Sequence, residues 1–465
     1  GVAMVMTAGS ASVSRDSPPV FNNLLVWKDE VVPWMKRLTD DCHEAGAAVM
    51  IQLSHLGRRT RWDKGDWLPV LAAGPSREPS HRAFPKVMED WDISRVVKDY
   101  ADAAERMAAA GVDGVEFECY GHLMDQFISP LTNGMPAGPY DASSLDNRLR
   151  FAFDVLQACR DRVGPKFLLG MRYVADEDAP GGLPVEEGVE MARRFKASGL
   201  VDFVNIIRGR IHTDPAMTDV IPIQGMKSSP HLDLAGRIKA EVGLPTFHAA
   251  RIADVATARF AVSSGQLDMV GMTRAHMADP HIVRKIIEGR EEDIRPCVGA
   301  TYCLDRIYQG GMALCIHNPS TGREGSLPHA IPPAEVKKRV VIVGTGPAGL
   351  EAARVAAAAD ELRQAGFDAS GVAFDVTKSI VLPRTGAAEA ASFSGSVSVA
   401  ASARLPTSVQ AKPSAPARRP SRPWRSKICR LRWEPRAPCS SMAKTLAQPP
   451  RNRRRSISAD TTRPI

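Results

Sequence analysis

Hydrophobic and polar positions follow two alternating patterns from the start of the chain to about residue 290. Short apolar runs are typical of buried strands, and each is followed by a longer segment with the 3.6-residue spacing of an amphipathic helix. The predicted strands are 2–6, 47–53, 112–118, 167–173, 201–206, 245–249 and 268–272. The predicted helices are 30–45, 93–110, 145–162, 185–198, 231–242, 253–264 and 279–289.

Strands separated by helices of this length indicate parallel βα units. The pattern gives one strand fewer than the eight that close a TIM (β/α)8 barrel. We therefore predict an α/β fold consisting of a TIM barrel that lacks its first strand, and we expect the missing strand to precede residue 1. An open barrel would expose strand edges.

Polar side chains gather where the predicted strands end, which is where TIM barrels carry their chemistry. Arginine and histidine dominate this set, and arginines there suit a phosphate or the anionic edge of a bound group, because their planar donors form charge-assisted pairs. A single arginine of this kind is often only a solvated surface charge, but a whole set at successive strand ends favours a binding site. The set is Gln52, His55, Arg58, Tyr120, His122, Arg172, Arg208, His248, Arg251 and Arg274.

A cysteine-rich segment, 295–319, follows the predicted barrel. Cys297, Cys303 and Cys315 lie close together in sequence there, and thiolates at such spacing can hold an iron–sulfur cluster. A fourth ligand would be expected at Ala300, which has no donor atom. The alternative is three reduced cysteines in an ordinary loop.

A glycine-rich motif begins the next predicted unit. An apolar strand runs directly into Gly344, Gly346 and Gly349 and then into a helical pattern. Such glycines allow a tight turn and let the backbone approach a pyrophosphate. We expect a partial dinucleotide-binding unit for FAD, NAD(P) or ADP, with Asp375 as a late candidate for the ribose contact.

Charge and composition divide the chain unevenly. Residues 378–465 carry 18 Lys and Arg against 3 Asp and Glu, a net charge of +15, so residues 1–377 carry −7 and the net charge of +8 is due entirely to this Ser-, Pro- and Arg-rich stretch. Its composition is typical of disorder, and its abrupt start suggests an aberrant C-terminus. No recognition module accompanies the charge, so nucleic-acid binding is not expected.

The same features predict the domain organisation and the compartment. We predict four parts: a barrel over 1–292, a cluster segment over 293–330, the partial dinucleotide unit over 336–377 and a basic tail over 378–465. Neither a membrane span nor a signal peptide is recognisable, and eight irregularly spaced cysteines do not resemble a secreted disulfide framework. A cytoplasmic location is therefore expected.

Several motifs carry a family likeness. MIQLSHLGRR, YGHLMDQFISP, SLDNRLRF, HAARIAD, GMTRAHMADP and RPCVGATYC resemble the old yellow enzyme-like NADH:flavin oxidoreductases, in the branch of trimethylamine dehydrogenase and 2,4-dienoyl-CoA reductase. The resemblance covers residues 1 to about 358. Within this branch, YGHLMDQF together with REPSHRAFPK looks most like the N-methylproline demethylases.

The resemblance implies roles for individual residues. Gln52 would contact the pyrimidine edge of FMN, Arg172 would lie near its N1 and O2, and Arg274 would hold the phosphate with backbone groups near Ala250 and Arg251. Cys297, Cys303 and Cys315 would be ligands of a 4Fe-4S or 3Fe-4S cluster. The candidate catalytic residues are His122, where reductases of the group carry a tyrosine, Tyr120, which could hold an N-methylated cation or simply pack, and His248, which could instead be structural.

The resemblance also implies an activity. We expect an FMN and iron–sulfur dependent oxidoreductase that oxidatively demethylates N-methylproline or a similar amine, with Arg208 or His212 meeting a substrate carboxylate, and with an electron acceptor as its other partner. One alternative is an NAD(P)H-dependent enoyl or dienoyl reductase, and another is an inactive fragment of such an enzyme. A homodimer is expected only because relatives form oligomers.

Overall fold

The computed structural model of the chain describes residues 1–7, 9–18, 21–60, 68–80, 84–329 and 348–349. The chain divides into two compact units, Gly1–Glu335 and Val336–Ile465, and the fold described below is that of the first unit. The four-part division predicted from the sequence is finer than this and stays a prediction. Gly344, Gly346 and Asp375 lie outside the described residues.

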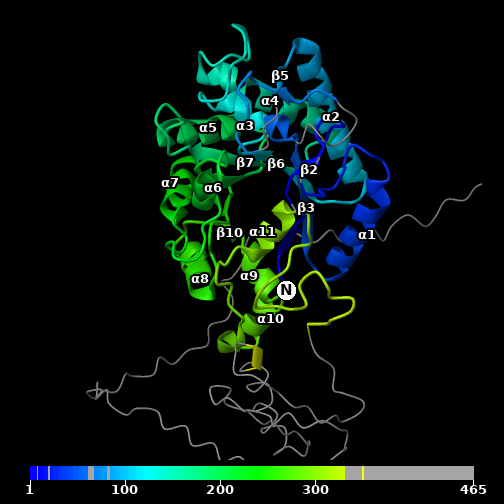
Figure 1. Cartoon of the computed structure of the whole chain (residues 1–465), viewed down its shortest axis with the longest axis vertical. Coiled ribbons are helices and arrows are strands. Elements are labelled where there is room, and N and C mark those ends of the chain that lie inside the picture. Colours follow the sequence, from blue (N-terminus) through cyan, green and yellow to red (C-terminus); the bar gives the residue numbers. More distant parts are fainter. Residues whose placement is uncertain (8, 19–20, 61–67, 81–83, 330–347, 350–465) are drawn as a thin grey trace, which may run out of the picture. The chain divides into compact units, whose positions relative to one another are not determined.

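Among the described residues, eight parallel strands form one sheet, and seven of them lie in the order in which they occur along the chain. Figure 1 shows the helices packed around this sheet. Each predicted strand is confirmed, although most are shorter than the apolar run that predicted them. A two-residue strand, β2 (Ala11–Ser12), pairs with the end of β3, and β4 (Leu71–Ala72) pairs with β5 (Lys86–Val87) in a separate sheet. The seven strands are β1 (Met4–Met6), β3 (Ala48–Ser54), β6 (Gly114–Cys119), β7 (Leu168–Asp176), β8 (Phe203–Arg208), β9 (Thr246–His248) and β10 (Met269–Val270).

Helices follow the strands and surround the sheet. Six predicted helices are confirmed to within a few residues, as α1 (Val31–Glu44), α2 (Asp90–Ala109), α4 (Leu145–Val163), α5 (Val185–Ser198), α7 (Leu232–Val242) and α8 (Val255–Ser263). Their ends have local causes: Glu89 and Asp92 form a reciprocal capping box on α2, and the Ser144 hydroxyl accepts a hydrogen bond from the Asn147 amide at the start of α4.

The last part of the helix prediction was wrong in detail. The segment 279–289 holds only α10 (Ile282–Ile287), and α9 (Thr273–Ala278) precedes it. Three other short helices had no sequence prediction: α3 (Leu123–Ile128), α6 (Asp214–Val220) and α11 (Tyr302–Tyr308). Helices of six or seven residues are too short to show a helical period, so their apolar spacing carries little signal.

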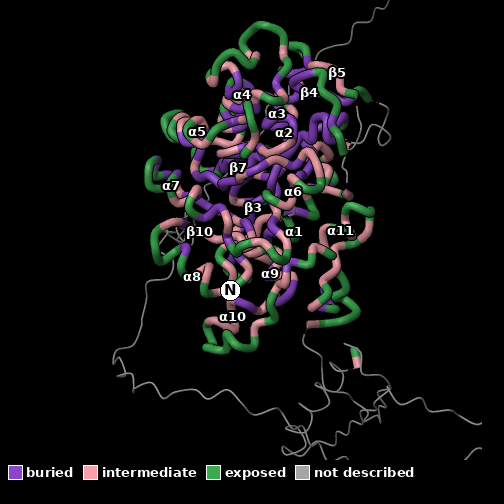
Figure 2. Tube along the Cα trace, turned by 60° about the vertical axis from the view of Figure 1, so that its left-hand side comes forward, coloured by how far each residue is buried: buried purple, intermediate pink, exposed green. Residues whose placement is uncertain are grey.

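Side chains alternate strictly between the two faces of the sheet, as the pleat of a strand requires. On β3, Val49, Ile51 and Leu53 belong to the main hydrophobic core, whereas Met50 belongs to a separate cluster inside the barrel. Figure 2 shows the buried residues, in purple, concentrated along β3 and β7.

A small apolar cluster fills one end of the barrel interior. Met50, Phe203 and Phe247 are buried there, with Met4, Met6 and Met269 packed against them. The rings of Phe203 and Phe247 stack with centroids 4.5 Å apart. Phe203 lies against Gly170, where any β-carbon would collide with its ring. This cluster closes the amino-terminal end and leaves the next inward positions of the strands to polar residues.

The strand order is that of a TIM barrel, but β1 and β10 do not pair with each other among the described residues. The observed architecture is therefore an open, parallel α/β barrel, and the predicted additional strand stays a prediction. None of the described helices has the length and apolar character needed to cross a membrane.

Candidate active site

A buried polar layer lies directly above the apolar cluster, on the inward faces of β3, β6 and β8. The Gln52 amide nitrogen donates to one oxygen of Glu116 at 2.6 Å, and the Asn205 amide nitrogen donates to the other at 2.8 Å. Their amide oxygens, Gln52 Oε1 and Asn205 Oδ1, are buried and have no hydrogen-bond partner among the described residues. Burial raises the pKa of Glu116, while Arg172 and the two amides oppose the shift. The layer therefore presents two free acceptors next to a carboxyl group.

A second carboxylate, Glu118, lies two residues further along β6 and binds His122. Nδ1 of His122 is 2.9 Å from Glu118 Oε2, and the Ser10 hydroxyl donates to the same oxygen at 2.6 Å. Burial alone would raise the pKa of Glu118, but His122, Ser10 and Tyr120 together lower it to about 2. Glu118 is therefore a carboxylate at neutral pH, and it fixes the orientation of the His122 ring.

Arg172 brings positive charge to this layer from β7. Its guanidinium lies over the Tyr120 ring, 4.9 Å from the centroid, and its Nε has no hydrogen-bond partner. Burial alone would lower the pKa of Arg172, but Tyr120, Glu116 and Glu118 raise it. The Arg172 guanidinium is therefore positively charged, and its Nε–H has no acceptor among the described residues.

His248 is the last residue of β9, which is separated by β8 from the strand that carries Arg172. Its Nδ1 lies 2.8 Å from the carbonyl oxygen of Ile206, so Nδ1 must carry the proton and donate it. Burial lowers the pKa of His248 to about 4, with Arg172 and His231 contributing. His248 is therefore neutral near pH 7, and its unpartnered Nε2 is an acceptor.

Two further arginines lie near the cysteine-rich segment. Arg251 adopts a left-handed backbone with φ of 52°, and its guanidinium fills the space beside Gly299. Arg274 donates through one terminal nitrogen to the carbonyl oxygen of Pro222 at 2.9 Å. One Nη atom of each arginine is buried without a partner. Two neighbouring guanidinium groups that each keep a nitrogen without an acceptor among the described residues suit a bound anion.

The cysteines are only partly brought together. Cys297 and Cys303 both lie close enough to Arg274 to influence its pKa, and burial raises the pKa of Cys303. Within the described residues, however, no group of three or more Cys, His, Asp or Glu side chains has the arrangement of a metal site. The three cysteines as placed do not fit a complete cluster site.

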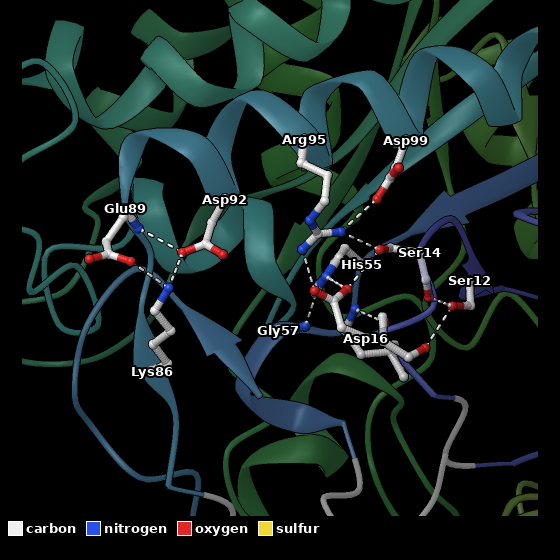
Figure 3. A network of polar contacts seen from close by, with 12 residues as sticks. Ser12, Ser14, Asp16, His55, Gly57, Lys86, Glu89, Asp92, Arg95 and Asp99 are labelled. Atoms are coloured by element: carbon white, nitrogen blue, oxygen red, sulfur yellow. Dashed lines mark hydrogen bonds and ion pairs between the residues drawn. The ribbon is translucent and has the colours of Figure 1, made fainter. Parts of the chain in front are cut away.

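Two residues of the predicted rim have structural partners instead. His55 is completely buried, and its Nε2 donates to Asp16 at 3.0 Å, because its Nδ1 accepts from the Gly57 amide (Figure 3). Arg208 is bound by Asp176 at 2.8 Å and by Asp178 at 2.9 Å.

The sequence reasoning missed Glu116, Glu118 and Asn205. A signal was present, because each is a polar residue inside a predicted buried strand. Glu116 and Glu118 are two positions apart, so their side chains lie on the same face of their strand. A charged residue inside such a strand indicates a polar site rather than an apolar core.

Comparison with known proteins agrees with this architecture. The model of the NADH:flavin oxidoreductase / NADH oxidase family matches residues 1–293. The chain belongs to this family. The family match spans every strand of the open barrel and every polar residue of the layer described above.

Individual family members extend the likeness. The chain is 70% identical over 356 residues to the "Probable N-methylproline demethylase" of Rhizobium meliloti (strain 1021), which covers 77% of this chain and 52% of that protein. It is 46% identical over 358 residues to the "Multifunctional alkene reductase/demethylase OYE" of Caballeronia cordobensis, with the same two coverages. The solved structure of histamine dehydrogenase from Rhizobium sp. 4-9 is 26% identical with a TM-score of 0.68, covering 76% of this chain and 51% of that one. The chain thus spans about half the length of the curated relatives it matches.

The unpartnered atoms test whether the barrel fits the FMN that the family implies. Within the described part of the chain, buried acceptors without a partner occur on Gln52, Asn205 and His248, and buried donors without a partner occur on Arg172, Arg251 and Arg274. Buried polar groups without partners are costly in a folded protein, so such a set at one end of a barrel indicates a bound polar group. A flavin with its phosphate offers both donors and acceptors, and the residues fit it.

Proposed function

We propose that this chain is the flavin-binding part of an oxidoreductase that removes an N-methyl group from N-methylproline or a closely similar amine. The observation that carries the proposal is the set of buried, unpartnered polar atoms around Arg172, directly beside Tyr120 and the His122–Glu118 pair. The 70% identity to a protein named as a probable N-methylproline demethylase supports this substrate class.

Each polar residue of the layer has a part in holding the cofactor in this proposal. Gln52 and Arg172 would hold the polar edge of the flavin ring, and Arg274, with the backbone around Arg251, would hold the phosphate. His248 would accept a hydrogen bond through its free Nε2. Bound FMN would supply the two-electron oxidant that the reaction needs.

The remaining residues act on the substrate. Tyr120 offers an aromatic face to an N-methylated cation, and its ring centroid lies 5.7 Å from that of His122. Once the amine nitrogen has lost its proton, transfer of a hydride from the N-methyl carbon to the oxidant that bound FMN would supply leaves an iminium ion. Addition of water then releases formaldehyde, the demethylated amine and one proton. His122, oriented by Glu118, is the group placed to accept a proton at this point.

A second function, reduction of an activated C=C bond by NAD(P)H through the same flavin site, is favoured by the relative named as both alkene reductase and demethylase. In that direction His122 would donate the proton instead of accepting it.

One experiment separates these possibilities. The chain is purified anaerobically, reconstituted with FMN and mixed with N-methylproline while the flavin absorption is followed. Bleaching without NAD(P)H supports demethylation, and bleaching that requires NAD(P)H supports the reductase. A chain that retains no flavin after reconstitution would contradict both and favour an inactive fragment.

The iron–sulfur cluster remains a prediction for Cys297, Cys303 and Cys315, and no step of the proposed reaction depends on it. Iron and acid-labile sulfide in the anaerobically purified chain would support the prediction. Their loss in Cys303→Ala, with flavin content unchanged, would assign the cluster to this segment. Absence of both elements from the unaltered chain would refute it.

A further inference from the structure

A separate polar pocket lies beyond the flavin-binding layer, above the ends of β3, β6, β7 and β8. It is partly open to solvent, and arginine, carboxylate and amide side chains line it. Gly121, which lies between Tyr120 and His122 in the chain, forms part of its wall. The pocket therefore adjoins the position proposed for the reacting amine.

The carboxylates that line this pocket are already engaged. Glu78 pairs with Arg59 at 2.8 Å, and Glu177 accepts hydrogen bonds from the Ser129 hydroxyl and the Leu183 amide. Asp125 accepts from the Gly121 amide at 2.6 Å. Burial, together with the nearby charge of Glu177, raises the pKa of Asp125 to about 7, which weakens its negative charge near neutral pH. The acidic side chains therefore leave little capacity for a cation.

Three side chains of the pocket keep polar atoms that have no partner among the described residues, whereas Arg59 and Arg210 are paired with Glu78 and Glu177. Arg58 is only 8% exposed, its Nη1 donates to the Ser76 carbonyl oxygen at 3.1 Å, and its Nε has no partner. Gln126 is 2% exposed, and neither atom of its amide group has a partner. Nδ1 of His212 is also unpartnered. Burial lowers the pKa of Arg58, and the charges of Glu78 and Asp125 only partly oppose this shift. The Arg58 guanidinium therefore lies near carboxylates, but within the part of the chain that the structure describes it forms no direct ion pair with one.

We propose that Arg58, assisted by Gln126, binds the carboxylate of the substrate and so makes this site selective for N-methylated amino acids over simple amines. A planar guanidinium is the group that best matches a carboxylate, and the amide nitrogen of Gln126 adds a neutral donor. This inference rests on the proposed function and deepens it by naming the residues that select the substrate. Arg208, the other arginine considered for this contact, is held by Asp176 and Asp178.

The test measures binding of the demethylated product, so that it does not require turnover. Proline and prolinamide have the same ring, but only proline has a carboxylate. Isothermal titration calorimetry of each against the FMN-loaded chain should show proline binding at least about tenfold tighter. Arg58→Gln should abolish this preference by weakening proline alone, and Arg58→Lys should restore part of it. Gln126→Leu, which keeps the guanidinium, should lower proline affinity by a smaller factor.

Arg148→Gln is the matched control. Arg148 is also a buried arginine, 5% exposed, but it binds the Ile128 carbonyl oxygen and Glu187 and does not line the pocket. It should leave the preference for proline unchanged. An unchanged preference in Arg58→Gln, an equal loss of both ligands, or no proline binding by the unaltered chain would overturn the inference. Proline selectivity in a chain whose flavin is not reduced by N-methylproline would refute the demethylase function while leaving the subsite in place.

Discussion

His248 illustrates how burial decides the chemistry of a single side chain. The sequence places a histidine at a strand end but cannot fix its protonation. Complete burial and the bond from Nδ1 to the Ile206 carbonyl oxygen leave it neutral, with Nε2 free to accept. Its place in the layer thus depends on the strand register that brings β8 beside β9.

The depressed pKa of His248 predicts a pH dependence of stability. A histidine that titrates at about 4 in the folded chain and near 6.5 when unfolded binds more protons in the unfolded state between these values. The free energy of unfolding should therefore fall by up to about 3 kcal/mol as pH drops from 6.5 towards 4. Urea unfolding at several pH values measures this.

His248→Asn is the control for this effect, because its amide can still donate to Ile206 but does not titrate. The variant should show a shallower decline over the same pH range. An equally steep decline in the variant would place the effect on other groups.

Arg172 carries a second prediction at the residue scale. Replacing it with glutamine removes the positive charge and the free Nε donor, and a hydrogen bond to a charged group contributes about 1.5–3 kcal/mol. FMN affinity, measured by quenching of flavin fluorescence, should fall at least tenfold. Arg150→Gln, an arginine on the exposed face of α4 with 60% side-chain exposure, should not change it. Equal FMN affinity in both variants would exclude Arg172 from the flavin site.

At the scale of elements, a buried network joins the loop before α1 to β3 and α2. Asp16 binds Nε2 of His55, receives the Ser14 hydroxyl at 2.7 Å and pairs with Arg95 of α2, which also contacts Asp99 (Figure 3). Although burial alone would raise the pKa of Asp16, these partners hold it well below its ordinary value. The network fixes the end of β3, from which Arg58 and Arg59 extend.

Removing the central carboxylate should therefore destabilise the fold. Asp16→Ala leaves Arg95 and the completely buried His55 without their shared partner, and an unsatisfied buried donor costs about 1–3 kcal/mol. The contribution of Asp16 should be fully present above pH 4 and should decline as pH falls below that. Urea unfolding at pH 7 measures the first effect. Asp40→Ala, which breaks an exposed pair with Lys36 on α1, should cost less than about 1 kcal/mol.

At the scale of the whole molecule, all candidate flavin contacts lie in the unit Gly1–Glu335. A chain ending at Glu335 should bind FMN with the same affinity as the full chain, as measured by fluorescence quenching. A more than tenfold loss of affinity would show that the second unit contributes to the site. Circular dichroism of the shortened chain checks that it is folded.

Sequence patterns determined the βα repeat and the polar strand ends, because period-2 and period-3.6 spacing depend only on local backbone geometry. The tertiary structure decided which polar residues act together. Register between neighbouring strands brings Gln52 opposite Glu116 and Arg172 opposite Asn205. Burial and neighbouring charges then shift the pKa values of Glu116 and Arg172. His55 and Arg208 end strands just as Gln52 and Arg172 lie on them, but packing gave the first two acidic partners and left atoms of the second two free. Burial and partnership are properties of contacts distant in sequence, and spacing along one strand cannot encode them.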